Sequence, residues 1–279
     1  MTDTVRDVNQ HFWSSKLIPF LTIRTTHNST QRYKAHSHSE LSVGIIESGT
    51  TQLSMSDEEL ILKKGDIILI EPNIVHACNP KEGASRSYHM LYIDDKWCCN
   101  VLSKLYGHTV KKYSCDLNFI PAFKSGIKLS DLIFSLITKE SHNNAIEVEL
   151  FLINLVSRHC IPLSEHEDES ELVCKLRNRF LQDLAYAPSL ETVAKEFGRS
   201  KETLIRTFKK RYGITPKSFL NNSRIEKAKI LLKHGMSIVD VATEVGFSDQ
   251  SQFHRTFVNY TASTPRQYQQ IMSIFDNKS

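Results

Sequence analysis

Several features that mark other classes of protein are missing from this chain of 279 residues. No run of about 18 apolar residues occurs, which argues against a helix that crosses a membrane. The first residues are polar and include Asp3 and Asp7, so they lack the charged-then-apolar plan of a signal peptide. The six cysteines show no C-x-x-C spacing, which argues against a cysteine zinc site and a disulfide framework. Together these absences predict a cytoplasmic protein with free thiols.

Acidic and basic residues are unevenly distributed along the chain. From Glu171 to the end there are 18 Lys and Arg residues against 10 Asp and Glu residues, a net charge of +8. The preceding part has a net charge of −4. A basic C-terminal part beside a mildly acidic N-terminal part predicts a polyanion as the partner of the C-terminal part alone.

The N-terminal part has the hydrophobic pattern of a β domain. Between Leu21 and Ile93, short runs rich in β-branched residues alternate with turn signals such as Lys64-Gly-Asp66. The runs expected to form strands are 41–46, 51–55, 60–62 and 67–70. Many strands of this length at this spacing predict a small barrel or sandwich.

A helical pattern follows the β-rich region. Apolar residues recur at helical spacing from about Phe119 to Cys160, and Ser141-His-Asn-Asn144 separates two expected helices. We expect these helices to cover the barrel. Their apolar stripe of Ile146, Leu150 and Ile153 faces either the barrel or a second copy of the chain, and the sequence leaves both possibilities open.

A polar, acidic segment after Pro162 predicts the boundary between two domains. We expect a linker at 164–170, between an N-terminal domain of residues 1–163 and a C-terminal domain of residues 171–279. The pattern of the C-terminal domain is helical throughout.

The C-terminal domain contains an internal repeat. Arg206-Thr-Phe208 recurs as Arg255-Thr-Phe257, and Thr215-Pro216 recurs as Thr264-Pro265 at the same offset of 49 residues. The apolar and glycine positions upstream match at an offset of 48 residues. The two copies are predicted at about 189–212 and 237–260, joined by one long helix from Pro216 to Leu232.

Each copy has the sequence logic of a helix-turn-helix. In the first copy, Ser189 and Ser200 are the expected helix caps. In the second copy, Ser237 caps the first helix, and Ser248 or Asp249 caps the next. Gly246 stands where the first of these helices ends and the chain must turn. Phe253 and Phe257 lie four residues apart, so they share the buried face of the following helix. The second helix of such a pair enters the major groove of DNA, and a rigid joining helix predicts two such helices roughly 34 Å apart.

The segment from Ser237 to Phe257, followed by Thr264-Pro265 and Tyr268, resembles the signature of the AraC/XylS family of bacterial transcription regulators. This resemblance implies a seven-helix DNA-binding domain that acts on promoters, most often as an activator that contacts RNA polymerase. The chain departs from the family pattern at Val258, where a basic residue is usual, and at Ala262, where glycine is usual. The second copy is therefore less basic than the first.

The resemblance and the outward face of each second helix predict the residues that contact DNA. Arginine pairs well with guanine and glutamine with adenine, whereas lysine suits phosphate. The predicted set is Lys201, Glu202, Ile205, Arg206, Lys209 and Lys210 in the first copy, and Gln250, Ser251, His254 and Arg255 in the second.

Histidines and a carboxylate gather in the β-rich part. In a strand, His36, His38 and Glu40 would alternate onto one face, and His76 comes from a later strand. Such residues are ligands for divalent metals. The pattern resembles the cupin barrel, whose metal-binding members use an H-x-H, a Glu and a distant His, although the second segment departs from the strict spacing and lacks its glycine.

Three interpretations of this histidine cluster stay open. Sensor domains of the resembled family are cupin-like and usually bind a small organic effector without metal, which favours an effector site at the barrel mouth. The first alternative is a metal-dependent cupin enzyme fused to the DNA-binding part, with His36, His38 and His76 as metal ligands. The second alternative is a barrel that only dimerises. The expected effector-binding residues are His36, His38, Glu40, His76, Tyr88 and Tyr92.

The sequence therefore predicts an α+β protein of two domains: a cupin-like β-barrel with covering helices, and an all-α domain with two helix-turn-helix motifs. The expected function is regulation of transcription, as an activator and not an enzyme, with no cofactor. The expected partners are double-stranded promoter DNA, RNA polymerase, a small-molecule effector and a second copy of the chain, and no membrane.

Overall fold

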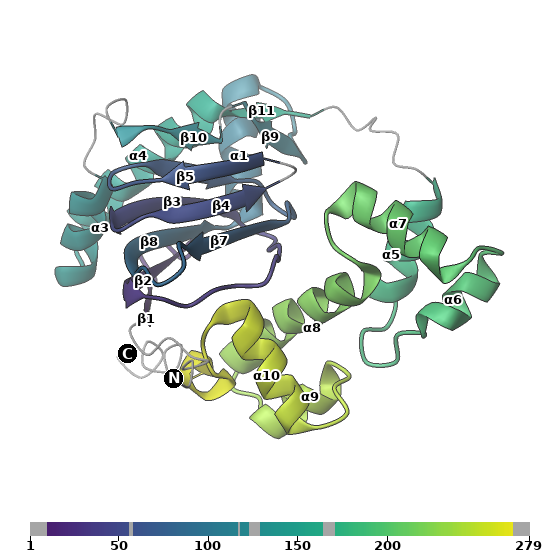
Figure 1. Cartoon of the computed structure of the whole chain (residues 1–279). Helices are drawn as coiled ribbons and strands as arrows, with labels where there is room; N and C mark the ends of the chain where they lie inside the picture. Colours follow the sequence, from purple (N-terminus) through teal and green to yellow (C-terminus); the bar gives the residue numbers. More distant parts are fainter. Residues whose placement is uncertain (1–9, 56–57, 117, 123–128, 164–170, 270–279) are drawn as a thin grey trace.

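The computed structural model describes residues 10–55, 58–116, 118–122, 129–163 and 171–269. A β-rich domain with covering helices is followed by an all-α domain (Figure 1). This is the α+β architecture that the sequence predicts. The expected linker at 164–170 lies outside the described residues. Within the described part of the chain, no helix combines the length and apolarity needed to cross a membrane.

The β domain contains two main sheets. The larger sheet has the strand order β1-β2-β8-β3-β6-β10 and the smaller has the order β5-β4-β7, with neighbouring strands antiparallel. The four predicted strand runs are present. The strands are β1 (Gln10–Ser14), β2 (Leu21–Ser29), β3 (Leu41–Ser48), β4 (Thr51–Met55), β5 (Glu58–Leu62), β6 (Ile67–Ile70), β7 (His76–Pro80), β8 (Arg86–Ile93) and β10 (Phe119–Ile120).

The larger sheet is buried on both faces. Side chains such as Ile46, Ile68 and Met90 point from one face toward the smaller sheet and pack against its Leu53 and Leu62. Residues of alternate register fill a second core on the other face, beneath helices. These covering elements are α1 (Asp95–Tyr106), α3 (Leu129–Thr138) and α4 (His142–His159), beside a small sheet of β9 (Tyr113–Cys115) and β11 (Cys160–Pro162).

The helical domain consists of two similar units joined by a long helix. Its helices are α5 (Glu171–Leu181), α6 (Leu190–Glu196), α7 (Lys201–Tyr212), α8 (Pro216–Lys233), α9 (Ile238–Glu244) and α10 (Gln250–Thr261). The predicted caps Ser189, Ser200 and Ser237 each accept a hydrogen bond from the backbone three residues on. Of the two expected caps for α10, Asp249 is the one whose side chain caps the helix.

The two units have separate hydrophobic cores, and the turn after α9 comes into close contact with the loop before α6. The first core contains Leu204 and Phe208, and the second contains Phe253 and Phe257. The loop before α6 meets the second unit at Gly246, where a Cβ atom would lie only 2.4 Å from the carbonyl oxygen of Ala185. This close approach fixes the second unit against the loop of the first.

The prediction that residues 36–40 form a strand is wrong. His36 makes only an isolated bridge, in which it exchanges backbone hydrogen bonds of 3.0 and 2.9 Å with His76. The His38 carbonyl accepts a hydrogen bond of 2.7 Å from the Asn73 backbone N–H of the β domain. Ser37, between the two histidines, has its backbone partner in Asn222 of the helical domain. At Ser37 another domain thus takes the place of a neighbouring strand, which no local sequence pattern reveals.

Candidate DNA-binding surface and interdomain site

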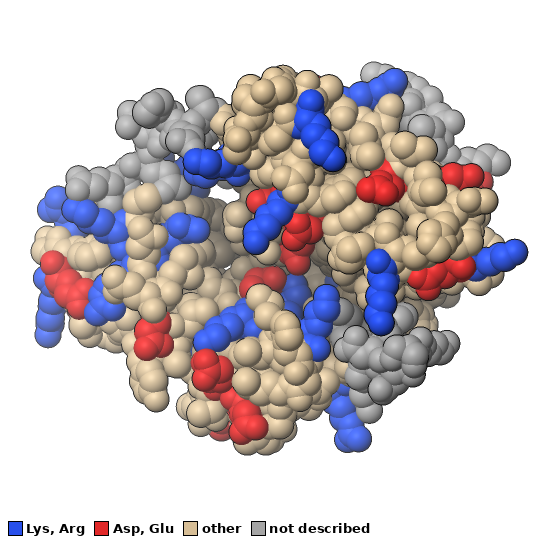
Figure 2. Space-filling model, turned by 180° about the vertical axis from the view of Figure 1, so that it is seen from behind, with Lys and Arg blue, Asp and Glu red and all other residues tan. Residues whose placement is uncertain are grey.

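The outward faces of α7 and α10 carry the predicted DNA-contacting residues. Leu204, Phe208, Phe253 and Phe257 are fully buried, so the opposite side of each helix faces outward. Of the ten predicted residues, Lys201 and Ile205 are half-buried and the rest are exposed: Glu202, Arg206, Lys209, Lys210, Gln250, Ser251, His254 and Arg255. Lys and Arg side chains are frequent over the lobe on the left of Figure 2, where the first unit lies.

One predicted phosphate contact is already engaged with an acid. The Lys201 Nζ atom lies 2.8 Å from the Glu191 Oε1 atom of α6, and this ion pair raises the pKa of Lys201. The pair is exposed, so water screens it and it contributes little to stability. Lys201 therefore remains charged and accessible at the start of the recognition helix.

The structure gives a reason for one of the two departures of the second unit from the resembled family pattern, the one at Val258. Val258 is 4% exposed, and the C-terminal half of α10 is buried with it at Tyr260 and Thr261. The neighbouring Asn259 accepts a hydrogen bond of 3.2 Å from the backbone of Lys34 in the β domain. Val258 thus lies in a docking face, whereas its counterpart Lys209 in the first unit is exposed. A buried docking face favours an apolar residue over a basic one.

A buried amide joins the two domains. The Asn222 side chain of α8 donates to the Ser37 carbonyl at 2.8 Å and accepts from the Ser37 backbone N–H at 3.3 Å. Both residues are buried, at 5% and 8% exposure. One asparagine therefore satisfies both backbone groups of Ser37, as a paired strand would do.

Replacing Asn222 with alanine is expected to loosen this contact. The change leaves both backbone groups of Ser37 without a partner, which costs about 1–2 kcal/mol in the docked state. Hydrogen exchange at the Ser37 amide measures the effect and should become faster. The half-buried neighbour Asn221 provides the matched control, so equal exchange rates in Asn222→Ala and Asn221→Ala would contradict the assignment.

A cavity of about 260 Å³ lies between the two domains. Figure 2 shows a hollow between them with acidic and basic side chains around it. The β domain contributes one wall, and α8, α10 and the segment after α10 contribute the other. The cavity is lined by Phe12, Pro19, Phe20, Thr22, Arg24, His36, His38, Ser39, Glu40, Tyr92, Asp94, Glu226, Lys229, Ile230, Lys233, Tyr260, Thr261 and Tyr268.

The predicted effector-binding residues are divided between this cavity and its surroundings. His36, His38, Glu40 and Tyr92 line the cavity. His76 packs against the two histidines, with ring centroids 4.7 Å from His36 and 4.8 Å from His38. Tyr88 does not line this cavity. It lies within the β domain, where its hydroxyl is 2.7 Å from the Tyr33 hydroxyl.

The three histidines are neutral at neutral pH. Burial, together with the neighbouring His76, lowers the pKa of His36 to about 3. Burial also lowers the pKa of His76 to about 4 and that of His38 well below its ordinary value. The imidazolium form is disfavoured because the site removes its hydration and supplies no carboxylate contact to it.

Charged residues that the sequence did not single out also line the cavity. Arg24 is 7% exposed, stacks over Tyr33 at 5.0 Å, and its Nε atom has no hydrogen-bond partner among the described residues. Lys229 lies 2.9 Å from Glu226 on the same helix. Burial alone would lower the pKa of Lys229, but Glu226, Tyr268 and Glu40 together raise that pKa above its ordinary value and keep the lysine charged. No sequence pattern marks these residues, because the cavity exists only between docked domains.

Two protein-family models match the chain. The AraC-like ligand binding domain matches residues 20–156, and the helix-turn-helix domain matches residues 193–271. The first match covers most of the β domain with its covering helices. The second covers the greater part of both repeated units and the helix between them.

Curated relatives are transcription regulators. The uncharacterised HTH-type transcriptional regulator YbfI of Bacillus subtilis (strain 168) is 29% identical over 236 residues, covering 79% of this chain and 81% of the relative. The HTH-type transcriptional activator RhaS of Enterobacter sp. (strain 638) is 34% identical over 102 residues, covering 36% of this chain and 35% of the relative. The similarity to YbfI thus extends over both domains.

Solved structures of ToxT from Vibrio cholerae have the same two-domain fold. Apo ToxT from strain SCE256, in a variant form, aligns with a TM-score of 0.57 at 14% identity, covering 91% of this chain and 98% of that chain. ToxT bound to (E)-4-(8-methylnaphthalen-1-yl)but-3-enoic acid aligns with a TM-score of 0.55 at 15% identity, covering 90% and 98%. At this identity the likeness concerns the fold.

Proposed function

The chain belongs to the AraC/XylS family of transcription regulators, and from that premise we propose that a small molecule held between its domains controls how it binds promoter DNA. It acts in the cytoplasm, by binding and not by catalysis. We further propose that it activates transcription by contacting RNA polymerase, since its C-terminal domain is similar to that of the activator RhaS. Residues 1–163 form the sensing domain and 171–279 the DNA-binding domain.

The observation that carries this proposal is the shared cavity. Arg24 and Tyr92 reach it from the β domain, and Lys229, Tyr260 and Tyr268 reach it from the helical domain. A molecule that contacts both walls is bound best by one arrangement of the domains. It therefore shifts the population toward that arrangement, which is the physical basis of an effector.

The cavity walls indicate the chemistry of the effector. The lining combines positive side chains, negative side chains and tyrosine rings. These features suit a small polar molecule with an aromatic or apolar part. The volume of about 260 Å³ is close to the lower end of common ligand sites.

A thermal-shift screen of small molecules tests the effector proposal. A compound that binds the native state raises its unfolding temperature. Ile230→Trp would fill the cavity, so it should weaken binding of any such compound about tenfold, or about 1.4 kcal/mol. Val239→Trp is the control, because Val239 is exposed to a similar extent, 57% against 59%, and does not line the cavity. A compound that binds both variants equally does not occupy this site.

Selection of binding sites from random duplexes tests the DNA proposal. The protein should enrich sequences with two elements about one helical turn apart, and it should protect two successive major grooves. Protection of one groove only would contradict the use of both recognition helices. Protection without sequence preference would contradict sequence-specific regulation.

We also propose that the chain forms a homodimer through α3 and α4. Ile146 and Leu150 on α4 are 51% and 59% exposed, and Phe134 on α3 is 69% exposed. Their exposure indicates that these residues do not pack on the β domain. Of the two partners that the sequence left open for the apolar stripe on α4, the β domain and a second copy of the chain, we therefore infer the second copy. A dimer would bind paired half-sites with higher avidity without new contacts.

Replacing Leu150 with glutamate is expected to give a monomer, because it would bury a carboxylate in an apolar interface. Sedimentation equilibrium measures the change in mass. Leu105→Glu on α1 is the matched control, since Leu105 is 54% exposed on a different helix. If both variants remain dimers, the interface lies elsewhere.

A further inference from the structure

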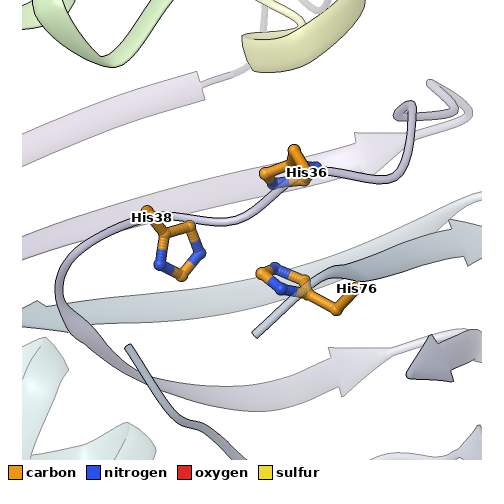
Figure 3. A group of neighbouring side chains, drawn as sticks. All are labelled: His36, His38 and His76. Atoms are coloured by element: carbon orange, nitrogen blue, oxygen red, sulfur yellow. The ribbon is translucent and has the colours of Figure 1, made fainter. Parts of the chain in front are cut away.

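His36, His38 and His76 converge from two separate segments of the β domain. One ring nitrogen from each lies within 4.8 Å of the others, and Figure 3 shows the three rings facing a common centre. His36 and His38 come from the segment that crosses toward the helical domain, and His76 is the first residue of β7. The isolated bridge between His36 and His76 holds the two segments together.

Backbone carbonyls set the tautomer of these rings. The Nδ1 atoms of His36 and His76 lie 2.7 Å from the Lys34 carbonyl and 2.9 Å from the Ile74 carbonyl. A carbonyl only accepts, so each Nδ1 carries the proton and each Nε2 keeps a free lone pair. The His38 Nδ1 atom has the same type of contact with the Glu40 carbonyl at 3.3 Å. A metal-bound histidine typically donates its other ring nitrogen to a carbonyl in this way.

The surroundings of the cluster suit a bound cation. His38 and His76 are 5% and 3% exposed, so their rings are largely withdrawn from water. Lys229 and Arg24 add positive charge nearby, while Glu40 and Glu226 add negative charge. The His38 Nε2 atom lies 3.4 Å from the Ser42 hydroxyl, a long contact that a metal ion would replace. One ring nitrogen of each histidine lies in the same small region.

We propose that His36, His38 and His76 bind one divalent transition-metal ion, such as Zn²⁺, Co²⁺ or Ni²⁺. Imidazole ligands suit these ions over Mg²⁺ or Ca²⁺. In a tetrahedral site with metal–nitrogen bonds of about 2.0–2.1 Å, the ligand atoms lie roughly 3.3 Å apart, so the rings close inward on binding. Three protein ligands leave a fourth position open. His36 and His38 line the interdomain cavity, so we place the open position on that side.

The site is also attached to the DNA-binding domain. Ser37, between the two ligands of the crossing segment, is bound by Asn222 of α8, and Lys34 donates to Asn259 of α10. A metal that draws His36 and His38 toward His76 moves this docking segment as well. Metal binding is therefore expected to change DNA affinity, and this second part rests on the proposed function.

Titration of the metal-stripped full-length protein with Co²⁺ tests the site directly. We expect one equivalent to bind and to give the intense visible absorption of a tetrahedral nitrogen site. His76→Gln and the less buried His36→Gln should each weaken binding at least about tenfold. His108→Gln, an exposed histidine outside the cluster, should bind like the original protein. The unfolding temperature without metal confirms that each variant is folded.

Equal Co²⁺ binding by all four proteins would overturn the metal site, as would octahedral spectra that vary little between them. The coupling is tested separately, by DNA affinity with and without Zn²⁺. We expect a change in the original protein that is lost in His36→Gln. If a metal binds to the three histidines without changing DNA affinity, the coupling is refuted and the metal site still stands. If the DNA footprint of the variants is unchanged, the proposed function stands even where the metal site fails. Failure of the metal site and failure of the proposed function are therefore distinguishable.

Discussion

Replacing Gly246 with alanine is expected to destabilise the helical domain by about 2–5 kcal/mol. Gly246 has a φ of +81°, in the left-handed region that costs an L-residue about 1–2 kcal/mol. A Cβ atom would also lie 2.4 Å from the carbonyl oxygen and 2.6 Å from the Cα atom of Ala185. These are backbone atoms that cannot rotate away, so the loop before α6 must shift, at a further cost of about 1–3 kcal/mol.

The first unit supplies the matched control for this substitution. Gly198 occupies the equivalent turn with a φ of +58°, but no atom lies within 4 Å of its ideal Cβ position. Gly198→Ala should therefore cost only the conformational penalty of about 1–2 kcal/mol. Urea denaturation of both variants measures the difference. Equal losses would mean that the contact between Gly246 and Ala185 does not hold the two units together.

The arginines at the centre of the recognition helices should dominate sequence preference. Arg206→Ala and Arg255→Ala are each expected to cost about 1–3 kcal/mol at the selected site and to relax base preference there. The two residues lie in separate units, so the double variant should lose about the sum, roughly 2–6 kcal/mol. Both side chains are exposed, so the loss would not reflect unfolding.

Lys209→Ala is the control for the arginine variants. A phosphate contact carries no sequence information, so its loss should weaken binding to all duplexes alike and reduce the salt dependence of binding. Affinities for the selected duplex and for a scrambled duplex, each at two salt concentrations, distinguish the two kinds of contact. Arginine variants that footprint like the original protein would refute the assignment of the base-reading face.

Local sequence signals predicted the secondary structure well where the chain satisfies its own backbone. Ser189, Ser200 and Ser237 cap helices because a short side-chain oxygen can reach an N–H three residues away. The same holds for the spacing of Phe253 and Phe257, which depends on one helical period. Such features need no knowledge of the rest of the fold.

Contacts between domains could not be predicted in this way. Ser37 and Asn222 are 185 residues apart, and neither has an unusual sequence context. The histidines that the sequence assigned to a strand face lie instead on a segment held by α8 and α10. Arg24 and Lys229 line the cavity only because the domains dock. The effector site therefore stays a prediction, and the predicted residues lacked the wall of the cavity that the helical domain supplies.

Phe12 has a consequence for how this protein can be divided. This residue belongs to β1 of the sensing domain, yet it is part of the hydrophobic core of the second helix-turn-helix unit and lies 5.5 Å from the ring of Tyr268. The Ser263 hydroxyl donates a hydrogen bond of 2.9 Å to the Oε1 atom of Gln10. A fragment that begins at Glu171 lacks Phe12 and would therefore expose apolar surface around Phe257 and Tyr268 that Phe12 packs against in the whole chain. A DNA-binding fragment that keeps its native surface must therefore include β1 as well as the residues from Glu171 onward. An exchange of sensing domains between relatives must likewise retain an aromatic side chain at the position of Phe12.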